Sequence, residues 1–64
     1  MNTKITQTEV NSAKKMVNGY SQSLLEITIK NGLTPAFKMA AFQILKMRGI
    51  NVRLPAGVEL EVVN

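Results

Sequence analysis

The feature that most constrains the fold is a helix with well-marked ends over residues 35–48. Thr34 is a good N-cap residue, and Pro35 follows at the first helical position, where its missing N–H leaves no hydrogen bond unmade. Gly49 stands directly after the last apolar turn, where a left-handed residue commonly ends a helix. These signals predict a helix around which the rest of a small chain must be packed.

The two sides of this helix differ in composition. One broad apolar face comprises Phe37, Ala40, Ala41, Ile44, Leu45 and Met47. The other side carries Lys38, Met39, Phe42, Gln43 and Lys46. Phe42 and Met39 can be interpreted in two ways: an N-terminal helix over residues 7–18 covers them as a second core layer, or they form an exposed patch bordered by lysines. Because such a patch suits docking, we take the five residues of this second side as candidate partner-binding residues.

A second helix is predicted over residues 7–18. Thr6 and Glu9 have the spacing of a capping box, in which the Thr hydroxyl accepts from the Glu backbone N–H. Apolar residues then recur at helical spacing, and Gly19 is expected to end the helix in a left-handed conformation. The Thr-rich start, Lys4–Val10, also allows a strand interpretation.

Strands are expected in two further segments. Residues 23–30 alternate between two faces, with Leu25, Ile27 and Ile29 on one of them, and their β-branched content favours a strand. Residues 50–63 contain two short alternating runs separated by a Pro-Ala-Gly turn, which predicts a β-hairpin.

The expected fold class is therefore α+β. The element order is helix–strand–helix–strand–strand, in a single small domain spanning residues 1–64. We expect a small three-stranded antiparallel sheet packed by the helices. Parallel pairing of the first two strands through a right-handed crossover is the alternative.

Composition excludes several classes of function. The 64 residues contain no Cys, His, Trp or Asp, and all four acidic side chains are glutamates. Disulfides, Cys-ligated zinc and thiol or imidazole catalysis are thereby ruled out, and scattered glutamates do not make a metal cage. We expect neither enzymatic activity nor a cofactor. No apolar run is long enough to span a bilayer, so we expect a cytoplasmic protein with no membrane partner.

The net charge of +4 makes nucleic acid a possible partner. The candidate phosphate-contacting residues are polar or basic: Asn11, Lys14, Lys15, Asn18, Arg48 and Arg53. A charge of this size is also ordinary for a soluble small domain, and no nucleic-acid-binding motif is present. Nucleic-acid binding is therefore the alternative function.

The leading functional hypothesis is a small non-enzymatic protein-interaction module. The size and composition are typical of the short accessory proteins that phages and plasmids encode, so we expect a regulator or inhibitor of a larger protein machine. A chain this small has a limited core, and association with another protein or with itself is a usual source of added stability. The expected partners are therefore another protein or a second copy in a homo-oligomer.

Overall fold

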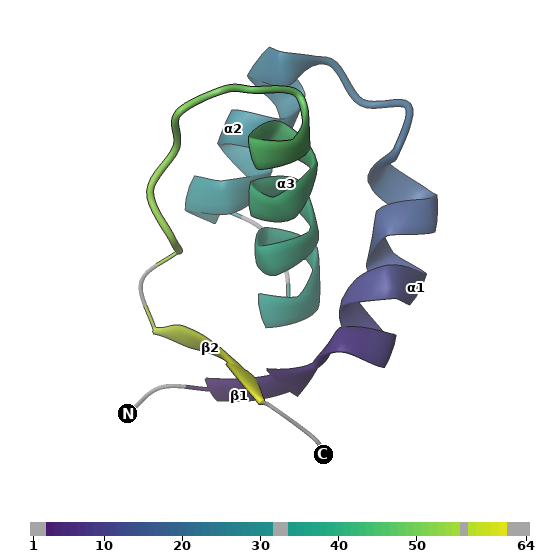
Figure 1. Cartoon of the computed structure of the whole chain (residues 1–64), viewed down its shortest axis with the longest axis vertical. Helices are drawn as coiled ribbons and strands as arrows, with labels where there is room; N and C mark the ends of the chain where they lie inside the picture. Colours follow the sequence, from purple (N-terminus) through teal and green to yellow (C-terminus); the bar gives the residue numbers. More distant parts are fainter. Residues whose placement is uncertain (1–2, 32–33, 56, 62–64) are drawn as a thin grey trace.

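The computed structural model describes residues 3–31, 34–55 and 57–61 of the chain. Five elements follow one another in the sequence (Figure 1): β1 (Thr3–Thr6), α1 (Gln7–Val17), α2 (Gln22–Asn31), α3 (Pro35–Met47) and β2 (Val58–Glu61). The protein is thus a small α+β structure with three helices and a two-stranded sheet in its described residues.

Helix α3 is the centre of the arrangement (Figure 1). Helices α1 and α2 both pack extensively against α3, and far less against each other. The segment of residues 50–55, which we call the return segment, runs back along α3 on the side away from α1, and the two strands lie together at one end of the helices. Because neighbours surround α3, five of its side chains are buried: Met39, Ala40, Ala41, Ile44 and Leu45.

The ends of α1 and α3 follow largely from local hydrogen bonds. The Thr6 hydroxyl accepts from the Glu9 N–H at 3.2 Å, and the Thr34 hydroxyl accepts from the Phe37 N–H at 3.3 Å. At the end of α3, Gly49 has a φ of 83°, and the N–H groups of Gly49 and the next residue donate to carbonyls in the last turn. This is the Schellman arrangement. The expectation for Gly19 is wrong, because its φ is not in the left-handed region.

The strand predicted over residues 23–30 is wrong, since this segment lies in α2. Helix α2 begins after Ser21, whose hydroxyl accepts from the Leu24 N–H at 3.3 Å. Leu25 and Ile29 are four residues apart and share a helix face directed at the core, whereas Ile27 projects from the opposite side. The same apolar residues therefore satisfy a helix once α3 is available as a packing partner.

The hairpin predicted over residues 50–63 is also wrong. Residues 50–54 are not a strand, and β2 instead pairs in parallel with β1, so that Thr3 lies opposite Val58 and Lys4 lies opposite Glu59. Neither the three-stranded antiparallel sheet nor the crossover alternative is therefore formed, because both required a strand at 23–30. The strand interpretation at Lys4 holds as far as Thr6, where α1 takes over.

The core joins all five elements. Its buried members are Ile5, Val10, Ala13, Val17, Leu25, Met39, Ala40, Ala41, Ile44, Leu45 and Val58. Of the apolar residues in the segments predicted to be strands, Leu25 and Val58 are buried, but Ile27 and Leu54 are more than half exposed. Val62 lies outside the described residues. The sheet is thus a small closure at one end of a helical core, rather than the platform under it.

Candidate functional site

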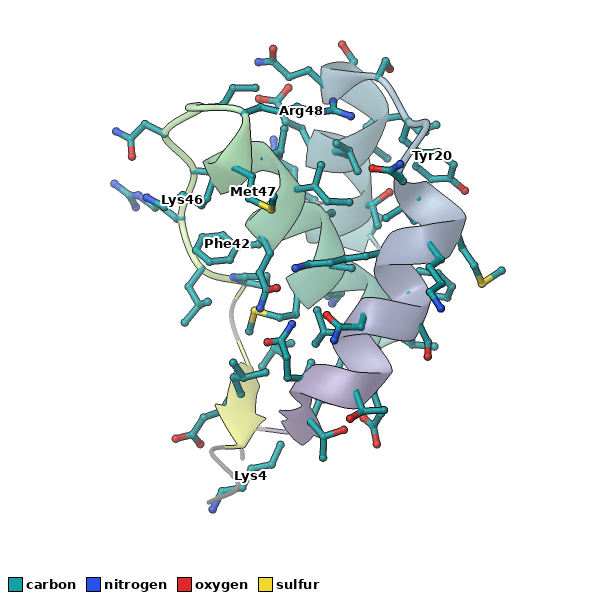
Figure 2. The ribbon with its side chains drawn as sticks, turned by 45° about the vertical axis from the view of Figure 1, so that its right-hand side comes forward. Lys4, Tyr20, Phe42, Lys46, Met47 and Arg48 are labelled. Atoms are coloured by element: carbon teal, nitrogen blue, oxygen red, sulfur yellow. The ribbon has the colours of Figure 1, made fainter. Side chains whose placement is uncertain are left out.

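The predicted partner-binding side of α3 is partly built into the core. Met39 is only 2% exposed, and Phe42 is half-buried and packed against the buried cluster. Figure 2 shows the Phe42 ring directed from α3 toward the return segment. Of the two interpretations of Phe42 and Met39, the core interpretation agrees with their burial. The covering expected from the N-terminal helix comes in part from the return segment, as seen for Phe42.

Gln43 is engaged on the other flank of this side. Its amide forms a reciprocal pair with Gln7 of α1, with N···O distances of 3.1 and 3.2 Å. Gln7 also donates to the Asn11 side chain at 2.9 Å. Lys46 is exposed, and Lys38 is half-buried. Of the five candidates, the two lysines therefore offer the charged ends that a partner could contact.

Lys38 belongs to a groove that the sequence analysis did not anticipate. This groove, which we call the basic groove, has a volume of about 540 Å³ and lies between α2, α3 and the return segment. It is lined by Glu26, Ile29, Lys30, Lys38, Val52, Arg53, Leu54 and Pro55. The groove could not be predicted from a strand at 23–30, because only a helix brings Glu26, Ile29 and Lys30 to one wall. The i, i+3, i+4 spacing of these three residues in the sequence would have indicated that a helix places them on one face.

A second groove lies between α1 and α2, where these helices diverge over α3. This groove, which we call the apolar groove, has a volume of about 300 Å³ and is lined by Val17, Tyr20, Leu24, Ile27, Thr28, Asn31 and Phe37. Leu24 and Ile27 are 43% and 55% exposed, so α2 presents apolar side chains to solvent here. None of the described residues that line this groove carries a charge.

The residues predicted to contact nucleic acid do not form one surface. Asn11, Lys15 and Asn18 are exposed on or just after α1, and Lys14 is half-buried. The return segment, which contains Arg53, lies on the other side of α3 from α1 (Figure 1). Arg53 itself lines the basic groove.

Arg48 has a structural contact instead. Its guanidinium donates to the backbone carbonyl oxygens of Tyr20 at 3.1 Å and Asn18 at 3.3 Å. Figure 2 shows Arg48 at the end of α3 that lies nearest Tyr20. These bonds tie the loop between α1 and α2 to the last turn of α3 and pair carbonyls that the end of α1 leaves free.

The described residues contain no group of three or more metal-ligating side chains. Their helices also include none with the length and hydrophobicity needed to cross a membrane. Lys30, Lys38 and Arg53 can donate hydrogen bonds but cannot accept them, and Glu26 is the single carboxylate among the described residues that line the basic groove. This donor set suits the binding of anionic groups.

Comparison of the chain with protein-family models, with curated proteins and with solved structures finds no match in any of the three.

Proposed function

We propose that this chain is a non-enzymatic protein-interaction module, a small accessory regulator or inhibitor whose docking surface is the basic groove. The observation that carries the proposal is the groove itself. It combines an apolar lining from two elements with cationic side chains from three, and it includes Lys38 from the predicted partner-binding set. An apolar centre with a charged border is the usual composition of a protein-binding surface.

Leu54 supports this assignment. Its side chain is 56% exposed although it lines a concave surface, and a partner that covered it would remove apolar area from water. Among the described apolar residues of the lining, Leu54 is the one that is exposed, because Ile29 and Val52 are half-buried and Pro55 is buried. Leu54 is therefore the residue whose replacement should matter most for docking.

The proposal is tested by affinity capture from the organism of origin with two matched variants. Leu54→Glu places a charge in the basic groove, whereas Met16→Glu makes the same kind of change at a 69% exposed side chain on α1, outside both grooves. We expect one protein to be retained by the wild type and by Met16→Glu, and to be lost with Leu54→Glu. Equal capture by all three chains, or no specific capture, would contradict the proposal.

Nucleic-acid binding is the second candidate. It is favoured by the exposed polar residues of α1, Asn11 and Lys15, and by Asn18 just beyond them. It has less support, because Arg48 is hydrogen-bonded to the loop after α1 and Arg53 lines the basic groove, away from the polar residues of α1. Phosphate contacts would produce binding that weakens steeply with salt. The oligonucleotide measurement described below distinguishes the two candidates.

Self-association and a cytoplasmic location complete the proposal. Residues 23–30 are helical and therefore offer no strand edge for self-association. In the described part of the chain the sheet has two strands, so each keeps an edge at which a second copy could pair. The absence of cysteine fits a reducing compartment, which is the reason for proposing the cytoplasm.

A further inference from the structure

The charges around the basic groove indicate the chemistry of its partner. Lys30 comes from α2, Lys38 from the first turns of α3 and Arg53 from the return segment, so three separate elements bring a cation to one site. Glu26 stands four residues before Lys30 on the same helix, a spacing at which the two charges attract each other. The described residues of the lining therefore set three cations against the Glu26 carboxylate, and Lys38 and Arg53 come from the two elements that bring no carboxylate to it. This excess of positive charge favours an anionic ligand.

The apolar part of the lining limits which anion fits. Among the described residues it consists of Ile29, Val52, Leu54 and Pro55, all of them aliphatic and none of them aromatic. Single-stranded nucleic acids are usually held by bases stacked on aromatic side chains. An aliphatic floor instead suits an aliphatic side chain, so the lining favours a polypeptide over a nucleic acid.

The backbone of the return segment favours the same class of ligand. Within the described residues, backbone hydrogen bonds outside helices and strands reach Ile50 and do not include residues 51–54. Backbone N–H and C=O groups that have no backbone partner can pair with an extended peptide laid alongside them. Residues 51–54 also supply Val52, Arg53 and Leu54 to the groove.

We propose that the basic groove binds an extended acidic segment of a partner protein, which sets an aliphatic side chain against Leu54 and carboxylates beside Lys38 and Arg53. This inference rests on the proposed function and adds the chemical class of the partner. The carboxylates would form charge-assisted hydrogen bonds with the two cations, while the aliphatic side chain would cover the exposed part of Leu54.

The test is a selection from a library of random dodecapeptides displayed on a carrier, with the full chain as bait. The wild type should enrich peptides in which an aliphatic residue is flanked by aspartate or glutamate. Arg53→Glu and Lys38→Glu should each shift the enriched set toward lysine and arginine, which a merely structural role of these residues would not do. Met16→Glu adds a negative charge on α1, outside the groove, and should leave the enriched sequences unchanged.

The dissociation constant of the tightest-binding selected peptide is then measured for the wild type and for each variant. Arg53→Glu should weaken its binding about tenfold, and Met16→Glu by less than about twofold, because electrostatic attraction decays within about a Debye length of the site. Circular dichroism of each variant confirms that it is folded. An oligothymidylate strand is measured in the same assay and should bind more weakly than the peptide.

The possible failures are distinguishable. If no peptide is enriched, both the proposed function and the inference are overturned. An enriched set of apolar peptides without acidic residues refutes only the inference, because a peptide-binding groove would remain. Tighter, steeply salt-dependent binding of the oligothymidylate than of any peptide, weakened by Arg53→Glu, would assign the groove to nucleic acid instead.

Discussion

Helices α1 and α2 flank the same central helix but are attached to it in different ways. Helix α1 buries three small side chains, Val10, Ala13 and Val17, and polar bonds at both ends of its interface connect it or its following loop to α3. Helix α2 buries only Leu25 and exposes Leu24 and Ile27. One flank therefore buries several small side chains, whereas the other buries one large side chain, with Ile29 partly buried beside it.

This difference in burial shows which helix of a small protein can present a binding surface. Side chains of α2 line both grooves: Glu26, Ile29 and Lys30 in one, and Leu24, Ile27, Thr28 and Asn31 in the other. Helix α1 buries Val10, Ala13 and Val17 in the core, and Met16 is its one exposed large apolar side chain. Helix α2 leaves Leu24 and Ile27 exposed, and it forms a wall of both candidate sites.

The largest expected effect follows from the single anchor of α2. Leu25→Ala should lower the free energy of unfolding by about 2–5 kcal/mol, because it leaves a cavity at a fully buried position. Val17→Ala on α1 should lower it by about 2 kcal/mol, since it removes fewer apolar atoms. Urea denaturation followed by circular dichroism measures both values.

The matched control for this comparison is Ile27→Ala, in the same helix as Leu25 but 55% exposed. It should change the unfolding free energy by no more than about 0.5 kcal/mol. If Ile27→Ala were as damaging as Leu25→Ala, the attachment of α2 through one side chain would be wrong.

A smaller effect is expected from the polar bonds on the α1 flank. Arg48→Ala removes two hydrogen bonds to backbone carbonyls, and Gln43→Ala removes the reciprocal amide pair with Gln7. Each substitution should lower the unfolding free energy by about 0.5–1.5 kcal/mol. Arg53→Ala is the control, because this exposed arginine lines the basic groove, and its effect should stay within about 0.5 kcal/mol. Thermal melts of the three variants would contradict this ranking if Arg53→Ala were the least stable.

Helices α1 and α3 could be predicted because their ends are determined by neighbouring residues. Thr6 caps α1 through Glu9, and Thr34 with Gly49 marks both ends of α3. These interactions extend over three or four residues, so the sequence pattern contains them directly.

The assignment of residues 23–30 failed for a physical reason that local patterns cannot resolve. Leu25, Ile27 and Ile29 alternate as in a strand, yet Leu25 and Ile29 are also about 40° apart on a helix and can share one face. The packing partner decides between the two, and α3 supplies a surface for Leu25. Tertiary contact thus outweighed the β-propensity of Ile27, Thr28 and Ile29.

The site was affected by the same error. Lys38 and Arg53 were both singled out from the sequence, but for different partners, since nothing local shows that they line one groove. Met39 and Gln43 were grouped with Lys38 by their angle on the helix, although the core contains one and α1 holds the other. Periodicity places residues on a face; it does not show which neighbour covers that face.

The parallel pairing of β1 with β2 has a consequence for the order of folding events. Thr3 lies opposite Val58, so the pair closes a loop that contains all three helices, and the chain entropy lost in that closure grows with the length enclosed. The helices can dock through shorter loops first, which shorten the distance that the strands must still cover. Strand pairing is then a late step, and weakening it should accelerate unfolding while leaving the folding rate nearly unchanged. Denaturant-jump kinetics of Val58→Ala would show this asymmetry, and a slowed folding limb would instead place the strand pair in the folding nucleus.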